Sequence, residues 1–254
     1  MSDLLDSMQL AINDCRTAID NWNSIKSHYD EIEKYFDPRK IYCFKKEDLD
    51  WIKPLNENDY FLLFPGIYDE KMVFIVAPTD STGNVKRLDS YRCLTSGYLD
   101  KDLQLYENSS VLKPVTLTKD FQFINFASQE KDLLSADDPT LTIADFSEGL
   151  NLWVEQSMDW FSEECNNHNG ERIFKVFNVP LADLKLDTDA EKVYTFFGLK
   201  ESLLYNMLVP ELYFVAENSQ GTMLTLNSGE KTGNTSDLSK PCPPFCNKVA
   251  EFPA

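Results

Sequence analysis

NDYFLLFPGIYDEKMVFIVA, residues 58–77, contains two runs of β-branched and aromatic residues around a turn-rich centre. The runs NDYFLLF (58–64) and KMVFIVA (71–77) predict two strands, and PGIYDE (65–70) predicts the turn of an antiparallel hairpin. Both alternating positions of each run are apolar. We therefore expect a sheet that is covered on both faces.

Further runs of the same composition follow along the chain, separated by turn residues. Strands are predicted at 85–94, 115–126, 172–179, 192–197 and within 211–226. In the last of these, ELYFVAE and TMLTL flank NSQG, whose Gly221 can take a positive φ, and this predicts a second hairpin. Because strands arrive mostly as hairpins, the predicted fold class is α+β with a largely antiparallel sheet of about six to eight strands.

Two helices are expected to cover this sheet. Residues 3–36 repeat large apolar side chains every seven positions until Asp37–Pro38 ends the pattern. This predicts one long N-terminal helix, which either packs on the protein's own core or serves self-association. A second amphipathic helix is predicted near 147–166, with a capping start at Asp145 and an end in NNHNG (166–170).

The length of 254 residues is sufficient for one domain with a sizeable core. We expect residues 1–228 to form a single α+β domain, with a sub-boundary near 128–146. Residues 229–254 are rich in Ser, Thr, Gly and Pro and poor in apolar side chains. This composition predicts a C-terminal tail or a loosely docked strap.

The sequence lacks the patterns of a secreted or membrane protein. MSDLLDS at the N-terminus has no basic, apolar leader, and the longest nearly apolar run, YFLLFPGI (60–67), is too short for a bilayer. Six cysteines in a chain of this length do not form a dense disulfide framework, so reduced thiols are expected. A cytoplasmic protein is therefore predicted, and the sequons at Asn108 and Asn234 are interpreted as chance matches.

Motifs with a known chemistry are scarce. The nine glycines form no nucleotide-phosphate loop, and H-E-x-x-H, G-x-S-x-G and C-x-x-C are absent. A Cys3His zinc site is one alternative, with Cys165, His168, Cys242 and Cys246 as ligands. The other is that ECNNHNGE (164–171) ends a helix, which is favoured because 73 residues separate the two halves of the metal set. No cofactor is predicted.

Charge is the strongest functional signal. The chain has 42 acidic and 24 basic residues, a net charge of −18, and residues 130–164 contribute half of it. The candidate partner-binding residues are Asp137, Asp138, Glu148, Glu155, Asp159 and Glu163. The last four, here called the acidic face, fall within an arc of roughly 80° on the second helix, opposite its apolar stripe.

This charge distribution excludes some partners and favours others. An acidic protein repels nucleic-acid phosphates and anionic membranes, so neither is expected as a partner. A basic protein or divalent cations at the acidic face are expected instead, although a merely solvated surface is the simpler reading. We predict a non-catalytic protein–protein interaction protein: an acidic inhibitor, an antitoxin-like partner or an assembly subunit. The alternative is a hydrolase with acid–base carboxylates in a cleft.

Overall fold

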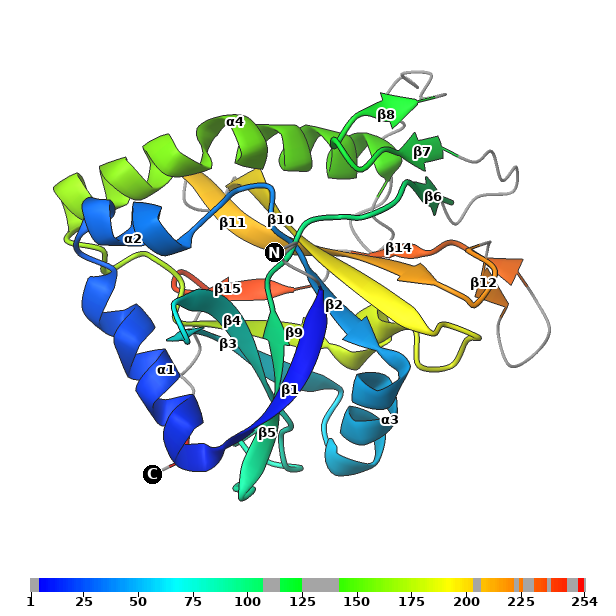
Figure 1. Cartoon of the computed structure of the whole chain (residues 1–254), viewed down its shortest axis with the longest axis horizontal. Helices are drawn as coiled ribbons and strands as arrows, with labels where there is room; N and C mark the ends of the chain where they lie inside the picture. Colours follow the sequence, from blue (N-terminus) through cyan, green and yellow to red (C-terminus); the bar gives the residue numbers. More distant parts are fainter. Residues whose placement is uncertain are drawn as a thin grey trace.

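The computed structural model describes an α+β protein whose helices surround packed antiparallel sheets (Figure 1). The described residues are 5–106, 115–124, 142–202, 207–221, 224–225, 231–236, 239–245 and 251–253. Its α-helices within these ranges are α1 (Ile12–Ile25), α2 (Tyr29–Tyr35), α3 (Lys46–Leu55) and α4 (Ile143–His168). The predicted α+β class with largely antiparallel pairing is confirmed.

Two large sheets contain most of the strands. The six-stranded sheet contains, in spatial order, β1 (Asp6–Ala11), β5 (Ser90–Thr95), β4 (Lys71–Ala77), β3 (Tyr60–Tyr68), β9 (Val176–Pro180) and β15 (Lys240–Cys242). The four-stranded sheet contains, in order, β14 (Thr235–Ser236), β11 (Met207–Glu217), β10 (Lys192–Ser202) and β2 (Tyr42–Lys45). A 3₁₀ turn, η1 (Leu181–Leu184), follows β9.

Two smaller sheets complete the described strands. One contains β6 (Leu103–Leu105), β7 (Val115–Leu117) and β8 (Phe123–Ile124). The other contains β12 (Leu224–Thr225) and β13 (Lys231–Thr232). The three-stranded sheet lies beside the N-terminal end of α4 (Figure 1). Part of the segment predicted as a strand at 115–126 therefore belongs to a sheet of its own.

The hairpin predicted at 58–77 forms, but its turn is shorter than expected. β3 runs to Tyr68 and pairs with β4 in antiparallel register. Only Asp69 and Glu70 remain for the turn, and both have positive φ, 49° and 57°. A two-residue turn between right-twisted strands requires this backbone geometry. β3 therefore extends at the expense of the loop, while β4 has the predicted bounds.

The hairpin predicted within 211–226 is wrong. β11 pairs with β10 along its whole length and with β14 on its other side, whereas β12 pairs with β13. Gly221 does take a positive φ of 67°, so a turn follows β11 as expected. The eleven-residue β10 gives β11 a far longer hydrogen-bonded ladder than the two-residue β12 can provide.

The prediction of one long helix over 3–36 is also wrong. This segment forms β1, α1 and α2. β1 pairs with β5 at the edge of the six-stranded sheet, and these ladder hydrogen bonds outweigh the local helical pattern. A turn at Lys26–Ser27 then separates the two helices and directs α2 against α4.

α1 covers the outer face of the six-stranded sheet. Its buried side chains are Cys15, Ala18, Ile19 and Trp22. A Cβ on Gly66 of β3 would lie 3.1 Å from the Ala18 Cβ, so the absence of a side chain lets α1 lie close to the sheet. The apolar side of α1 is thus used by the protein's own core.

The main core lies between the two large sheets. Phe74 of β4 contacts Phe177 of its own sheet, with ring centroids 5.9 Å apart. It also contacts Tyr42 and Phe197 of the opposite sheet, at 4.4 and 5.6 Å. All four rings are buried. Because aromatic side chains bury large areas, this cluster holds the two sheets face to face and explains strands that are apolar on both sides.

α4 is the predicted second helix, although it starts earlier than expected. Its N-cap is Thr142, whose hydroxyl accepts a hydrogen bond from the Asp145 N–H at 3.1 Å. The C-terminal end agrees with the prediction: Asn169 is left-handed, with φ 51°, and its N–H donates to the Glu164 carbonyl. The helix packs mainly on β10 and buries Trp153 completely.

The C-terminal segment, which was expected to be a tail or a loosely docked strap, is docked in its described residues. β14 joins β11, and β15 joins β9. Phe252 packs against Phe64 and Tyr91, with ring centroids 5.4 and 4.8 Å apart. The Arg16 Nε donates to the Pro253 carbonyl at 2.7 Å. Backbone pairing needs few apolar side chains, so a segment of polar composition can dock in this way. The described part of residues 231–253 is called the C-terminal strap below.

No helix of the described ranges has a stretch both long and apolar enough to cross a bilayer. α4 is the longest of them, with 26 residues, and it carries acidic side chains along one side. The sub-boundary predicted near 128–146 lies mostly outside the described residues. The division into domains stays a prediction.

Candidate functional site

The acidic face lies on the outer side of α4. All four of its side chains, Glu148, Glu155, Asp159 and Glu163, are exposed. Fifteen positions separate the first from the last, which is roughly 22 Å along a helix. Asp137 and Asp138, the other two predicted partner-binding residues, lie outside the described part of the chain.

Most of the acidic face is not neutralised by basic side chains in the described part of the chain. Glu155, Asp159 and Glu163 form no ion pair with any lysine or arginine that the structure describes. Glu148 is engaged in an interaction within the chain. Glu164, next in sequence, is buried and binds Arg172 through two hydrogen bonds of 3.0 and 2.6 Å, so it belongs to the interior.

α2 extends the acidic face with carboxylates of its own. It packs beside α4 (Figure 1), and its Asp30 and Glu33 are exposed. The Tyr29 hydroxyl donates to Glu33 at 3.5 Å. Partial burial, together with the negative charges of Glu33, Asp159 and Asp30, raises the Tyr29 pKa. The negative charges of α2 and α4 therefore act together where the two helices meet. The spacing of acidic residues within one helix could not predict this.

The residues of the alternative zinc site have other roles. Cys242 is disulfide-bonded, so it has no thiolate to offer, and the expectation of reduced thiols is wrong for it. The Cys165 thiol donates to the Lys26 carbonyl at 3.2 Å. His168 is exposed in the last turn of α4, and Cys246 lies outside the described residues. Across the described ranges, no group of three or more His, Cys, Asp or Glu could hold a metal ion.

The remaining cysteines are core thiols. Burial raises the pKa of Cys15 and of Cys43 to about 12, and it raises that of Cys93 as well. A thiol with a raised pKa is a weak nucleophile near neutral pH. His28, the other histidine, lies exposed at the start of α2, where its Nδ1 is 3.0 Å from the Ser27 hydroxyl. The described residues contain no hydrogen-bonded Cys–His pair.

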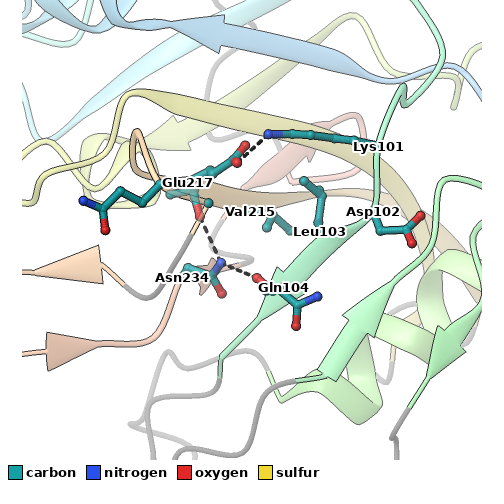
Figure 2. Close-up of a pocket in the computed structure, with 10 residues that line it drawn as sticks. Lys101, Asp102, Leu103, Gln104, Val215, Glu217 and Asn234 are labelled. Atoms are coloured by element: carbon teal, nitrogen blue, oxygen red, sulfur yellow. Dashed lines mark hydrogen bonds and ion pairs between the residues drawn. The ribbon is translucent and has the colours of Figure 1, made fainter.

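A small polar pocket lies between the end of β11, the start of β6 and the turn after β11 (Figure 2). Its volume is ≈ 230 Å³. The polar residues of its lining are Lys101, Asp102, Gln104, Glu217, Gln220 and Asn234. Lys101 reaches across the pocket, and its Nζ lies 2.5 Å from the Glu217 Oε1.

The two charged groups of this ion pair differ in their exposure to solvent. The Glu217 side chain is only 11% exposed, whereas that of Lys101 is 43% exposed. The second carboxylate oxygen of Glu217, Oε2, accepts no hydrogen bond from the described residues. Tyr194 lies close to this carboxylate, and burial, nearby negative charge and a polar side-chain contact with Glu217 together raise the pKa of Tyr194. Asp102 points away from Glu217 and accepts a hydrogen bond from the Lys119 N–H at 3.0 Å (Figure 2).

Asn234 supports the pocket from below. Its amide donates to the carbonyls of Gln104 and Ala216 at 2.8 and 2.9 Å, and its Oδ1 accepts from the Tyr106 N–H at 2.8 Å. The residue is 2% exposed. A glycan on this buried amide would disrupt its donated hydrogen bonds, which supports the interpretation of this sequon as a chance match. The sequon at Asn108 lies outside the described residues.

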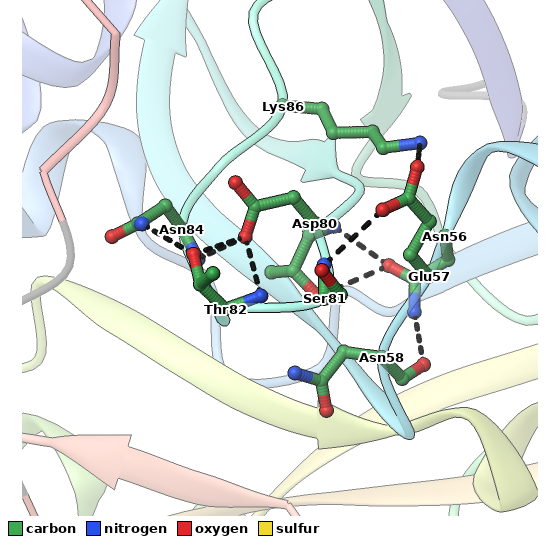
Figure 3. A network of polar contacts seen from close by, with 9 residues as sticks. Asn56, Glu57, Asn58, Asp80, Ser81, Thr82, Asn84 and Lys86 are labelled. Carbon is green, nitrogen blue, oxygen red and sulfur yellow. Dashed lines mark hydrogen bonds and ion pairs between the residues drawn. The ribbon is translucent and has the colours of Figure 1, made fainter.

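A second polar cluster surrounds the turn at 80–84 (Figure 3). The Asp80 carboxylate accepts hydrogen bonds from the N–H groups of Thr82 and Asn84, at 2.8 and 3.0 Å. These bonds, and one from the Thr82 hydroxyl, lower the Asp80 pKa. Asn56 holds the adjacent backbone by accepting from the Thr79 N–H at 2.7 Å. All of these contacts satisfy the backbone of the turn, so the cluster is structural.

Comparison with known proteins identifies no relative. No protein-family model, curated protein or solved structure matches the chain significantly. The acidic face and the pocket are therefore the features of the molecule that bear on its function. Sequence reasoning missed the pocket, because Lys101, Glu217 and Asn234 are distant in the chain and no motif links them.

Proposed function

We propose that the protein is a non-catalytic interaction protein that binds a basic protein partner through the acidic face. The observation that carries the proposal is the exposure of Glu155, Asp159 and Glu163 without an ion pair in the described residues. Each like-charge neighbour destabilises a helix by a few tenths of a kcal/mol. A cationic partner turns this repulsion into attraction and also accelerates association.

The described structure favours a basic protein over divalent cations or self-association. The acids of α2 widen the charged surface beyond one helix, which suits a folded basic partner. Divalent cations are less well supported, because the described residues contain no group of three metal ligands. Self-association through the N-terminal helix is also less well supported, since α1 uses its apolar side on the protein's own sheet. An acidic inhibitor or antitoxin-like partner is therefore preferred to an assembly subunit.

The hydrolase alternative has weaker support. Acid–base catalysis by carboxylates needs two of them near one reacting bond. In the described pocket Glu217 faces Lys101, while Asp102 points elsewhere (Figure 2). The zinc-binding alternative would need a thiolate at Cys242, which the disulfide removes.

A cytoplasmic location, without nucleic-acid or membrane partners, is part of the proposal. Its support is the net charge of −18, the four buried free cysteines and the inaccessible amide of Asn234. The disulfide at Cys242 favours an oxidising compartment and is the observation against it. Alkylation of thiols during lysis of the native cells tests this point: a Cys242 that is found alkylated supports the cytoplasm, and one protected until reduction contradicts it.

Affinity capture from the native host tests the binding proposal. The bait is the wild-type protein or a variant with Glu148→Gln, Glu155→Gln, Asp159→Asn and Glu163→Gln. A control variant neutralises four exposed acids elsewhere on the molecule: Asp20→Asn, Glu47→Gln, Glu70→Gln and Asp187→Asn. Both variants have the same net charge, so only the position of the charge differs between them.

We expect the wild type and the control variant to retain the same basic protein at low salt and to release it near 1 M salt, where the screening length is about 3 Å. The acidic-face variant should retain little of it at any salt concentration. Equal retention by the two variants would refute the proposal, as would a partner that is not basic.

A further inference from the structure

The pocket at Glu217 has the properties of a ligand site for a cation. A buried carboxylate is stable only with a compensating partner, and the partner here is the Lys101 ammonium. Lys101 is nearly half exposed, so it can leave the pocket without losing a buried position. The site therefore contains a fixed anion and a cation that can be displaced.

The carboxylate uses only part of its capacity for hydrogen bonds. Its Oε1 binds Lys101, while its Oε2 accepts no hydrogen bond from the described residues. A Cβ on Gly221 would lie 2.9 Å from the Oε1, so the glycine leaves the approach to this oxygen open. A guanidinium group presents two parallel N–H donors to both oxygens of a carboxylate, which a single ammonium does not.

The size and the charge of the pocket agree with such a ligand. Its volume of ≈ 230 Å³ is below the roughly 300–1,000 Å³ of pockets for drug-sized ligands. It therefore suits a guanidinium with a short aliphatic stem and is too small for a nucleotide. Two carboxylates and one ammonium line it, so anions are repelled. The exposed Gln220 also lines the pocket, and its side-chain carbonyl can accept a hydrogen bond from a further N–H donor.

We propose that this pocket binds a guanidinium group, which replaces the Lys101 ammonium on Glu217. The ligand is either a small free guanidine compound or the arginine side chain of a protein. The site is separate from the acidic face, so it does not depend on the function proposed above.

Isothermal titration calorimetry with agmatine and with an amidated Gly-Arg-Gly peptide tests the proposal. The proteins are the wild type, Lys101→Ala, Glu217→Gln and, as a control with the same charge change as the last, Glu70→Gln at the exposed β3–β4 turn. Tetramethylammonium, a cation without N–H donors, controls for non-specific attraction.

We expect wild type and Glu70→Gln to bind at least one of the two guanidinium probes equally, and tetramethylammonium not at all. Lys101→Ala should bind that probe about three- to fivefold more tightly, because an exposed competing ion pair is removed. Glu217→Gln should lose binding at least tenfold. If only agmatine binds, the ligand is a free guanidine; binding of the peptide assigns it to an arginine side chain.

The proposal is overturned if neither probe binds the wild type, if tetramethylammonium binds as well as agmatine, or if Glu217→Gln keeps the wild-type affinity. Should Glu217→Gln not fold, the comparison of Lys101→Ala with the wild type decides: an unchanged affinity overturns the proposal. The behaviour of the acidic-face variants in affinity capture has no bearing on these outcomes.

Discussion

Lys26 is a buried cation that should destabilise the protein below neutral pH. It follows α1 directly, it is 5% exposed, and its Nζ has no hydrogen-bond partner in the described residues. Burial, and to a lesser extent the charge of Lys175, lowers its pKa from 10.5 to about 7. This difference corresponds to about 5 kcal/mol between the charged and neutral forms in the folded protein.

The sign follows from proton linkage. Between pH 7 and 10.5 the unfolded chain binds a proton at Lys26 that the folded protein does not, so the free energy of unfolding rises with pH. Below pH 7 both states are protonated and the whole penalty is present. From pH 7 to 8.5 the gain is about 2 kcal/mol, at about 1.4 kcal/mol per pH unit.

Lys26→Met removes the charge and keeps a long unbranched side chain. We expect the variant to be more stable than the wild type by about 3–5 kcal/mol at pH 6, and this advantage should shrink by about 2 kcal/mol at pH 8.5. Urea unfolding followed by tryptophan fluorescence measures both values, since Trp22 stacks on Phe174 near the end of α1. Lys175→Met, at an exposed position, is the control and should change stability by less than about 1 kcal/mol. A variant no more stable than wild type at pH 6, or a difference that does not change with pH, would refute the reasoning.

Three further predictions concern the contacts that hold the fold, each measured by urea unfolding. Arg172→Met should destabilise the protein by about 2 kcal/mol, because it leaves the Glu164 carboxylate buried without its partner. Adding Glu164→Gln to this variant should restore part of the lost stability. Equal stability of Arg172→Met and the wild type would contradict this. Asn234→Ala should cost about 3 kcal/mol, since one donor and two acceptors of the buried backbone lose their bonds; a loss under 1 kcal/mol would show that water replaces them. Phe252→Ala should cost about 2–3 kcal/mol if the C-terminal strap is docked, and no change would mean that it is free in solution.

Local patterns predicted the elements whose stability is local. The β3–β4 hairpin and the end of α4 at Asn169 follow from short-range turn and capping chemistry, and both were found. The N-cap of α4 was predicted at Asp145 but is Thr142, three residues earlier. Asp145 is instead the third residue of the helix, and its carboxylate accepts a hydrogen bond from the Thr142 hydroxyl. Thr142 with Asp145 and Asp145 with Glu148 both have the spacing of a capping pair, so the sequence alone does not distinguish them.

Long-range pairing explains the larger errors. The N-terminal repeat of seven predicted one helix, but residues at its start complete the edge of a sheet formed by β5, more than 80 positions away. The partner of β11 was misassigned for the same reason, since periodicity identifies a strand and does not identify its neighbour. The polar composition of the C-terminal segment predicted a tail or a loosely docked strap rather than strands, because composition does not register backbone pairing.

The two candidate sites also differ in how far the sequence could predict them. The acidic face was predictable because helical spacing alone places its side chains on one side of α4. The contribution of α2 needed the tertiary structure. The pocket was not predictable, because Lys101 and Glu217 are far apart in the chain and meet only in the folded protein, where Asn234 bonds the Gln104 and Ala216 carbonyls beside them.

Carboxyl footprinting in the native extract tests the central claim most directly. Carbodiimide coupling with an amine tag, read by mass spectrometry, reports the accessibility of each carboxylate in the purified protein and in the extract. We predict that labelling of Glu155, Asp159 and Glu163 falls severalfold in the extract at low salt and recovers at high salt, while Glu70, exposed at the β3–β4 turn, does not change. Equal labelling of the three residues under all conditions would contradict the claim that a basic partner binds the acidic face.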